Sequence, residues 1–299
     1  MPSPDPGQSS STHTIGSALR ELTAQLFRAG IVDAGGDVRR LVVAVLGLSS
    51  AGVLAGPERS LTPAQLQVLR GYVERRQQRE PVSRILGERG FYGRAFAISP
   101  ATLDPRPDSE TLIAAALETV RDEGWISRPL RILDVGTGSG CLLLTLLCEL
   151  PNATGVGTDI SDAALETARE NARRLGVLER ADWLQADGLE SITGPFHIVV
   201  TNPPYVRTAD IAALEPEVRN FEPTQALDGG VDGLALYRRL VPRVSIVAPN
   251  GWVVLEVGYD QAEAVAALLA ETPGIDAARI RVHRDVAGKR RCVAAKTLS

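Results

Sequence analysis

Apolar residues recur at helical spacing in the first part of the chain. Positions i, i+4, i+7 and i+11 of an amphipathic helix are filled by Ile15, Leu19, Leu22 and Leu26. A second helix is predicted around residues 41–46. A third begins at Thr62, where Gln65 completes a capping box and Pro63 takes the first helical position. Residues 15–83 are therefore predicted to form an all-helical domain.

The pattern changes twice further along the chain. Residues 84–100 place aromatic and β-branched residues between glycines, which predicts a β-hairpin linker. In residues 101–299, apolar strands then alternate with amphipathic helices, which is typical of an α/β domain with a mostly parallel sheet. Strands are predicted at residues 131–135, 154–159, 181–185, 197–201, 251–257, 280–283 and 292–295. Helices are predicted from residues 140 and 161, and over residues 234–247 and 261–270.

Composition narrows the class of protein. With 44% hydrophobic and 23% charged residues, the chain is typical of a folded globular protein. The longest apolar run, residues 142–147, is far shorter than the roughly 18 residues of a membrane span. Residues 1–14 lack the features of a secretory signal and are predicted to be a disordered tail. We therefore expect a cytoplasmic protein without a membrane partner.

Charge and chemistry-bearing residues exclude several functions. The net charge of −4 disfavours stable nucleic-acid binding, which needs a cationic surplus. The three cysteines form no CxxC pair and the three histidines lie far apart, so no metal site is predicted. The cysteines are interpreted as core residues: Cys141, Cys148 and Cys292.

A glycine-rich loop follows the strand at residues 131–135. Its residues are Gly136, Thr137, Gly138, Ser139 and Gly140. Glycines allow a ligand to approach the backbone closely, and the following helix presents free N–H groups to an anion. A tight turn without a ligand is the alternative.

Two acidic residues lie where neighbouring strands end. Asp159 follows the next strand and is placed to accept hydrogen bonds from ribose hydroxyls, whereas a helix cap is the alternative. Asp187 follows the third strand, where a carboxylate can bind the amine of adenine. The GxGxG pattern and the absence of a following Lys-Ser/Thr pair disfavour dinucleotides and triphosphates. What remains is a compact adenosine cofactor with a zwitterionic amino-acid tail, and S-adenosylmethionine fits that description.

The fourth strand leads into Asn202-Pro203-Pro204-Tyr205. Two prolines remove two backbone donors, so the loop presents acceptors. The Asn202 side-chain oxygen and the Pro203 carbonyl can accept the two N–H bonds of an amide or aromatic amine, and Tyr205 offers a flat wall. Acceptors arranged around a pyramidal nitrogen favour the transition state of methyl transfer over the planar amide. A rigid turn is the alternative.

Together these motifs resemble the class I S-adenosylmethionine-dependent methyltransferases, and among them the release-factor glutamine methyltransferase family. The resemblance extends over residues 37–296 and includes the segments 103–110, 222–223, 226–230 and 232–234. It implies a Rossmann-like domain preceded by a helical substrate-recognition domain. It also implies methylation of the side-chain amide nitrogen of the glutamine in the Gly-Gly-Gln loop of release factors. We expect a monomer whose partner is the release factor.

The resemblance also assigns roles to residues. The glycine loop, Asp159, the Asp187-Gly188 turn and Asn202 would contact the cofactor, and residues 202–205 would hold the glutamine. Leu103, Arg106 and Glu110 would close over the site.

Two residues depart from the family's pattern. Asp104 replaces an apolar residue, so a carboxylate beside the acceptor pocket is expected, and Gly188 replaces a bulkier residue on adenine, which predicts weaker cofactor binding. Methylation of another protein glutamine, for example in a ribosomal protein, stays open. So do methylation of the adenine N6 in nucleic acid, which requires base flipping, and a non-catalytic adenosine-binding module.

Overall fold

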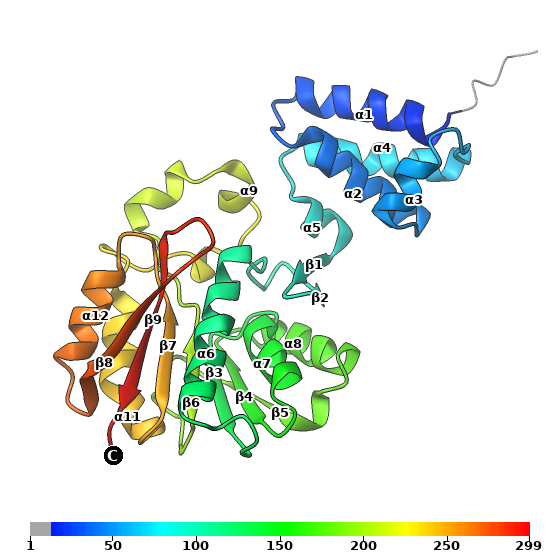
Figure 1. Cartoon of the computed structure of the whole chain (residues 1–299). Coiled ribbons are helices and arrows are strands. Elements are labelled where there is room, and N and C mark those ends of the chain that lie inside the picture. Colours follow the sequence, from blue (N-terminus) through cyan, green and yellow to red (C-terminus); the bar gives the residue numbers. More distant parts are fainter. Residues whose placement is uncertain (1–12) are drawn as a thin grey trace, which may run out of the picture. The chain divides into compact units, whose positions relative to one another are not determined.

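The computed structural model describes residues 13–299 and separates into a unit that ends at Leu86 and a second unit, Gly87–Ser299 (Figure 1). Residues 1–12 of the predicted tail lie outside the described residues. Thr14 belongs to the folded part, because its side chain caps the first helix. None of the helices in residues 13–299 combines the length and apolar character needed to cross a membrane.

The first unit is helical, as predicted. Its helices are α1 (Ile15–Arg28), α2 (Ala34–Leu46), α3 (Ser50–Ala55), α4 (Pro63–Gln77) and α5 (Val82–Leu86). The predicted capping box is present, with Thr62 accepting from the Gln65 N–H and Gln65 accepting from the Thr62 N–H. In the buried interior, Arg76 Nε donates to Asp37 Oδ2 at 2.7 Å, which joins α4 to α2.

The hairpin opens the second unit. Strands β1 (Glu88–Phe91) and β2 (Arg94–Ala97) pair antiparallel. The two turn residues, Tyr92 and Gly93, both have positive φ, which matches the twist of a two-residue hairpin turn. Residues 84–86, predicted within the hairpin, are instead the last turn of α5, because the short Val82–Leu86 helix gives too few residues for a helical period.

A seven-stranded sheet forms the centre of the second unit. Its order is β5-β4-β3-β6-β7-β9-β8, and β9 runs antiparallel to both neighbours. The strands are β3 (Arg131–Val135), β4 (Thr154–Asp159), β5 (Ala181–Gln185), β6 (Ile198–Thr201), β7 (Trp252–Glu256), β8 (Ile275–Arg284) and β9 (Arg290–Thr297). This order confirms the predicted Rossmann-like α/β class, with the order of the parallel strands reversing between β3 and β6.

Helices cover both faces of the sheet (Figure 1). On one face, α6 (Glu110–Asp122), α7 (Cys141–Glu149) and α8 (Asp162–Arg174) bury apolar side chains against alternate strand residues such as Ile132 and Ile198. On the other face, α10 (Ala235–Leu240), α11 (Val244–Val247) and α12 (Ala262–Ala270) cover the intervening residues, such as Leu133 and Val199. The predicted helix over residues 234–247 is interrupted by a 3-10 turn at Val241–Arg243, where Pro242 cannot donate a helical hydrogen bond.

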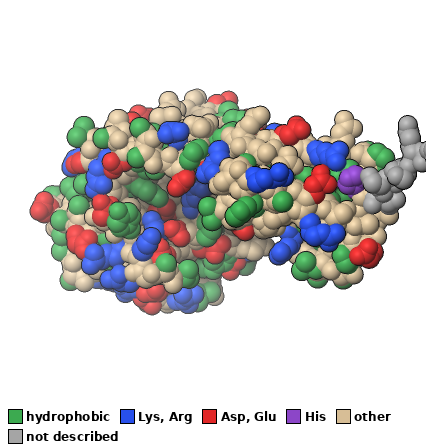
Figure 2. Space-filling model, turned by 90° about the horizontal axis from the view of Figure 1, so that it is seen from above, with side chains coloured by type: hydrophobic (Ala, Val, Ile, Leu, Met, Phe, Trp, Pro, Cys, Tyr) green, Lys and Arg blue, Asp and Glu red, His purple; other side chains and the backbone are tan. Residues whose placement is uncertain are grey.

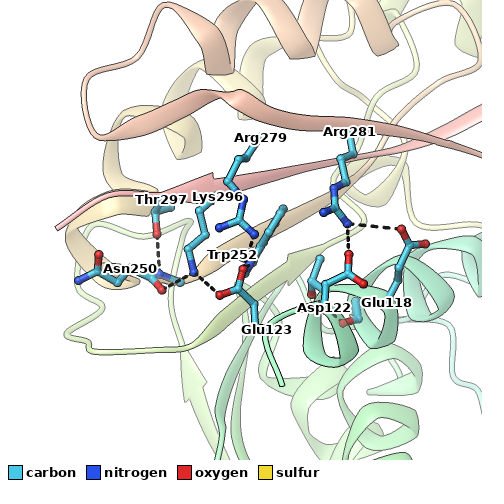
Figure 3. A network of polar contacts seen from close by, with 12 residues as sticks. Glu118, Asp122, Glu123, Asn250, Trp252, Arg279, Arg281, Lys296 and Thr297 are labelled. Atoms are coloured by element: carbon cyan, nitrogen blue, oxygen red, sulfur yellow. Dashed lines mark hydrogen bonds and ion pairs between the residues drawn. The ribbon is translucent and has the colours of Figure 1, made fainter. Parts of the chain in front are cut away.

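Helix α6 is tied to the far strands by charged side chains (Figure 3). Glu123, at the end of α6, accepts from Arg279 of β8, from Lys296 of β9 at 3.2 Å and from the Trp252 indole at 3.3 Å. Arg281 of β8 reaches Asp122 at 2.5 Å. These contacts fix the helix on the sheet, and with it the segment before the helix that lines the site.

Candidate active site

A cavity of about 560 Å³ lies at the carboxyl edge of the parallel strands. Figure 2 looks onto this edge and shows the surface of the second unit hollowed, with hydrophobic and charged side chains together. Its walls come from the ends of β3, β4, β5 and β6 and from two connecting segments, residues 101–109 and 223–228. The volume is in the range of small-molecule and cofactor pockets.

The glycine loop forms one wall of the cavity. Gly136, Gly138 and Gly140 have φ of +70°, +56° and +79°, so the alternation of glycine reflects three left-handed backbone positions. At Gly140 a Cβ would lie 2.9 Å from Leu144 Cδ1 and 3.2 Å from Ala168 Cβ, so this glycine also lets α7 approach α8 closely. The loop is built to bring bare backbone against a ligand.

A buried carboxylate stands behind the glycine loop. Asp134 Oδ2 accepts from Thr137 Oγ1 at 2.7 Å and from the Leu143 N–H at 3.3 Å. Its Oδ1 atom has no hydrogen-bond donor among the described residues. Complete burial raises the pKa of Asp134 to about 7. This residue was not among those predicted, although it immediately precedes Val135 and the loop.

Asp159 lines the cavity at the end of β4. Its carboxylate accepts from the Gly138 N–H at 2.9 Å and from the Ser161 N–H at 3.0 Å. The cap of α8 is Ser161, which accepts from the Ala164 N–H, so Asp159 is not the helix cap. Each carboxylate oxygen keeps a second lone pair, which leaves it able to bind a ligand hydroxyl.

Asp187 and Gly188 line the cavity beyond β5. Asp187 is exposed and pairs with Arg239 at 3.1 Å, and Arg239 also donates to Glu190 at 2.8 Å. Gly188 has a φ of +71°, and a Cβ there would lie 2.9 Å from Glu190 Oε2. A larger residue at this position would be strained in the present backbone, so Ala186 and Leu236 supply the apolar lining instead.

The Asn202-Pro203-Pro204-Tyr205 loop follows β6, opposite the glycine loop. Asn202 and Pro204 line the cavity, whereas Pro203 and Tyr205 are not among its lining residues within the described chain. The Asn202 Nδ2 atom donates to Ser109 Oγ at 3.2 Å, which leaves Oδ1 as the acceptor. Tyr205 was predicted to offer a flat wall to the substrate. Its hydroxyl instead donates to buried Glu256 at 3.3 Å, and the side chain does not line the cavity.

Leu103 and Arg106 line the cavity as the resemblance implies. Arg106 Nη2 donates to Glu222 Oε1 at 2.9 Å, and the Asp104 N–H donates to Glu222 Oε2 at 3.1 Å. Glu222 therefore joins the two segments that cross this side of the cavity. The Asp104 side chain does not stand beside the pocket as expected: it is 2% exposed and faces Arg89 of the hairpin at 3.6 Å.

Glu110 is placed away from the cavity, contrary to expectation. It begins α6, is not among the lining residues of the described chain, and accepts from the Tyr92 N–H at 2.8 Å. Its contact is with Tyr92 in the turn of the hairpin.

Several residues of the site were not predicted. Glu256 ends a strand of five buried residues, and a carboxylate closing such an apolar run was a usable signal. Gln261 donates to the Tyr205 carbonyl at 2.9 Å and accepts from the Gly258 N–H at 3.0 Å. No local pattern predicts Gln261, because its partner lies 56 residues earlier. Ser109 lies in the segment 103–110 that the resemblance includes, but no role was predicted for it.

Known proteins share this architecture. The PrmC N-terminal domain model matches residues 17–87, and the Methyltransferase small domain model matches residues 111–215. The release factor glutamine methyltransferase of Rhodospirillum rubrum is 46% identical over 269 residues, which cover 90% of this chain and 80% of that protein. That of Bradyrhizobium diazoefficiens is 44% identical over 95% of each chain. The solved hMettl16 catalytic domain, bound to an RNA hairpin, is 14% identical with a TM-score of 0.54 over 82% of this chain and 86% of that one.

The sheet order, the glycine loop and the loop after β6 define a Rossmann-like class I methyltransferase. The hMettl16 likeness extends to the fold alone. The identities to whole-length relatives decide the family: the chain belongs to the release factor glutamine methyltransferases.

Proposed function

We propose that the chain methylates the side-chain amide nitrogen of the glutamine in the Gly-Gly-Gln loop of peptide-chain release factors, with S-adenosylmethionine as the donor. Family membership supports the acceptor, since the relatives carry that activity in their names. The observation that carries the proposal is Asn202, whose Oδ1 is left as an acceptor on the cavity by the Nδ2 contact with Ser109.

The cavity fits the proposed donor. The glycine loop offers bare backbone at one end, Asp159 offers lone pairs for ribose hydroxyls, and Asp187 lines the far end. The buried Asp134 carboxyl lies behind the loop, and a cationic amino-acid tail bound nearby would favour its ionised form. Bound S-adenosylmethionine supplies an electrophilic methyl group at its sulfonium.

The acceptor side needs only positioning. An amide nitrogen is a poor nucleophile because its lone pair is delocalised into the carbonyl. In this proposal Asn202 Oδ1 accepts one of its N–H bonds and the Pro203 carbonyl accepts the other, which favours a pyramidal nitrogen because both hydrogen bonds strengthen in the transition state. Burial and the Glu256 carboxylate raise the pKa of Tyr205, so its phenol keeps its proton and does not act as a base.

The N-terminal helical unit is assigned to substrate recognition. All residues that line the described cavity lie within residues 101–239. The helices of residues 15–86 do not line it and are therefore available for this role. The protein is proposed to act as a monomer in the cytoplasm, and no stable complex with nucleic acid is expected.

Transfer of label from S-adenosylmethionine tests the proposal. The acceptors are a release factor, its variant with alanine for the loop glutamine, a ribosomal protein and DNA. We expect label on the release factor alone. Label on DNA, or label that persists on the alanine variant, would overturn the assignment.

A further inference from the structure

The loop Asn202–Tyr205, here called the acceptor loop, has few groups that can hold it in place. Pro203 and Pro204 have no N–H, so neither can be anchored through a backbone donor of its own. Asn202 is fixed from the strand side, where it follows β6 and donates to Ser109 at 3.2 Å. The far end of the loop therefore needs a donor that comes from another segment and reaches a loop carbonyl.

Gln261 supplies such a donor. It stands directly before α12 and is 4% exposed. Its Nε2 donates to the Tyr205 carbonyl at 2.9 Å and to the Gly233 carbonyl at 3.3 Å. One buried amide thus joins the end of the acceptor loop to the segment 227–233, whose Asp228 lines the cavity.

The orientation of the Gln261 amide is fixed by a backbone N–H. Its Oε1 accepts from the Gly258 N–H at 3.0 Å, and the Gln261 N–H donates in turn to the Gly258 carbonyl at 2.9 Å. A backbone N–H can only donate, so it selects the oxygen end of the amide. Nε2 is then turned toward the two carbonyls, and each of its two N–H groups has an acceptor.

The backbone around this contact is packed too closely for side chains. A Cβ at Gly233 would lie 2.3 Å from Gln261 Nε2 and 2.4 Å from the Tyr205 oxygen. A Cβ at Gly229 would lie 2.8 Å from the Pro204 oxygen. The acceptor loop therefore lies directly against the backbone of the segment 227–233, and Gln261 closes this contact from the α12 side.

Hydrogen bonds continue beyond the loop, but they begin one residue too late to replace Gln261. The Val206 N–H donates to the Leu227 carbonyl at 2.9 Å, and the Val206 carbonyl accepts from the Gly229 N–H at 2.8 Å. Within the described residues no backbone N–H donates to the Tyr205 carbonyl. The peptide group that ends the acceptor loop is thus held by Gln261.

We infer that Gln261 is a positioning residue that fixes the far end of the acceptor loop by holding the Tyr205 carbonyl. Proline restricts φ but leaves ψ to rotate, so the carbonyls of the loop keep one direction only if both ends are held. The inference rests on the proposed function, in which Asn202 Oδ1 and the Pro203 carbonyl accept the N–H bonds of the substrate. A displacement of about 1 Å in such groups is enough to lower the rate by about 100-fold.

Gln261→Met removes the donor and keeps an unbranched side chain of similar length. We expect kcat for release-factor methylation to fall by at least about tenfold, while KM and the Kd of S-adenosylhomocysteine change by less than about threefold. Cofactor affinity is retained because the glycine loop and Asp159, which we propose to hold the cofactor, follow other strands. A smaller loss of kcat, or an equal loss of cofactor affinity, would overturn the inference.

Gln261→Glu tests the donor end alone. Its carboxylate can still accept from the Gly258 N–H, but at alkaline pH it has no proton for the Tyr205 carbonyl. We expect kcat to fall by at least about tenfold here as well. A wild-type kcat would show that only the turn at residues 258–261 needs this side chain, which contradicts the inference.

Val265→Ala is the matched control for lost stability. Val265 is fully buried in the same helix, and its truncation leaves the hydrogen bonds of Gln261 in place. Thermal unfolding should show a lower melting temperature, whereas kcat should stay within about twofold of wild type. If Val265→Ala loses as much kcat as Gln261→Met at a similar melting temperature, Gln261 acts on stability and the inference fails.

A double variant with Asn202→Ala decides whether Gln261 acts through the acceptor loop. Residues that act on one bound group lose rate non-additively, so Gln261→Met should lower kcat by less than about threefold in the Asn202→Ala background. Equal losses in both backgrounds would overturn the inference. If thermal unfolding shows that Gln261→Met does not fold, Gln261→Asn takes its place, because its shorter amide cannot reach both Gly258 and Tyr205. A wild-type chain inactive on release factor would instead contradict the proposed function.

Discussion

Asn202 follows directly on Thr201, the last residue of a strand in which all four side chains are buried. The polar group that we propose contacts the substrate amide is therefore attached directly to a buried strand of the sheet. Ser109 holds its amide at 3.2 Å, and the two prolines that follow restrict the backbone. The buried strand β6 thus fixes the position of Asn202, and the Asn202 side-chain oxygen is the group proposed to act on the substrate.

Asn202→Ala removes the proposed acceptor and leaves the glycine loop intact. We expect kcat to fall by about 100-fold or more, because one oriented hydrogen bond in the transition state is lost. Calorimetry with S-adenosylhomocysteine should give a Kd within about fivefold of wild type. Comparable losses in kcat and in donor affinity would mean that Asn202 acts mainly on the cofactor.

Asp134→Asn tests the cost of the buried carboxylate. The folded-state pKa of about 7 lies above the ordinary value of 3.8, so between these pH values the folded state keeps a proton that the unfolded state has lost. The free energy of unfolding therefore falls as pH rises through this window, and the penalty is complete above it.

Asparagine carries no such penalty and can still accept from Thr137 and Leu143. Relative to wild type, the stability of Asp134→Asn should rise by up to about 4 kcal/mol from pH 4 to pH 8. Denaturant unfolding at several pH values measures the difference. A difference that is constant across this range would contradict the raised pKa.

At the scale of elements, the turn between β3 and α7 requires glycine at its end. Gly140 combines a φ of +79° with a Cβ direction blocked by Leu144 and Ala168. Gly71, inside α4, has open space where a Cβ would stand and no positive φ. The backbone therefore requires glycine at position 140 and can accept a side chain at position 71.

Alanine at each position gives a matched pair of variants. Gly140→Ala should lower the free energy of unfolding by about 1–3 kcal/mol and weaken donor binding, because the backbone and α7 must shift. Gly71→Ala should raise it by about 0.5–1 kcal/mol through helix propensity alone. Chemical denaturation of both variants measures this. Equal effects of the two substitutions would show that the left-handed turn carries no strain.

Most of the longer elements were predicted from their apolar pattern, but helix α6, 13 residues long, was not among the predicted helices. Helix α4 was placed by its capping box, and β3, β4 and β5 by the alternation of strands with helices along the chain. The short helices α3 and α5 were not predicted, because six and five residues are too few to show a helical repeat of apolar positions. Strand β8 was predicted too short, because residues before Ile280 are mostly polar or exposed and pair across an irregular register.

Contacts between distant segments were not predictable. The glycine loop and Asn202 each lie beside a strand, so their place on the carboxyl edge followed from topology. Glu222 with Arg106 and Glu256 with Tyr205 join residues 116 and 51 positions apart. One sequence gives no local signal for such pairs, and the direction of the Asp104 side chain was predicted wrongly for the same reason.

At the scale of the whole molecule, the cavity belongs to the second unit alone. Its lining residues lie between Ala101 and Arg239, and the boundary between the units falls at Leu86. Binding of S-adenosylmethionine should therefore be independent of the helical unit, for which we propose recognition of the protein substrate.

A chain that begins at Gly87 separates these two roles. Once its folding has been verified by thermal unfolding, its Kd for S-adenosylhomocysteine should lie within about threefold of the full chain. Its kcat/KM on release factor should fall by at least about tenfold. Full activity of the shortened chain would remove the recognition role from residues 15–86.

Fragmentation mass spectrometry of methylated release factor tests the central claim most directly, because it locates the transferred methyl group atom by atom. After incubation with the full chain and S-adenosylmethionine, one methyl group should lie on the side-chain amide of the glutamine in the Gly-Gly-Gln loop, and Asn202→Ala should leave that peptide unmodified over the same time. A methyl group on any other residue, or an unmodified peptide with active wild-type enzyme, would contradict the account.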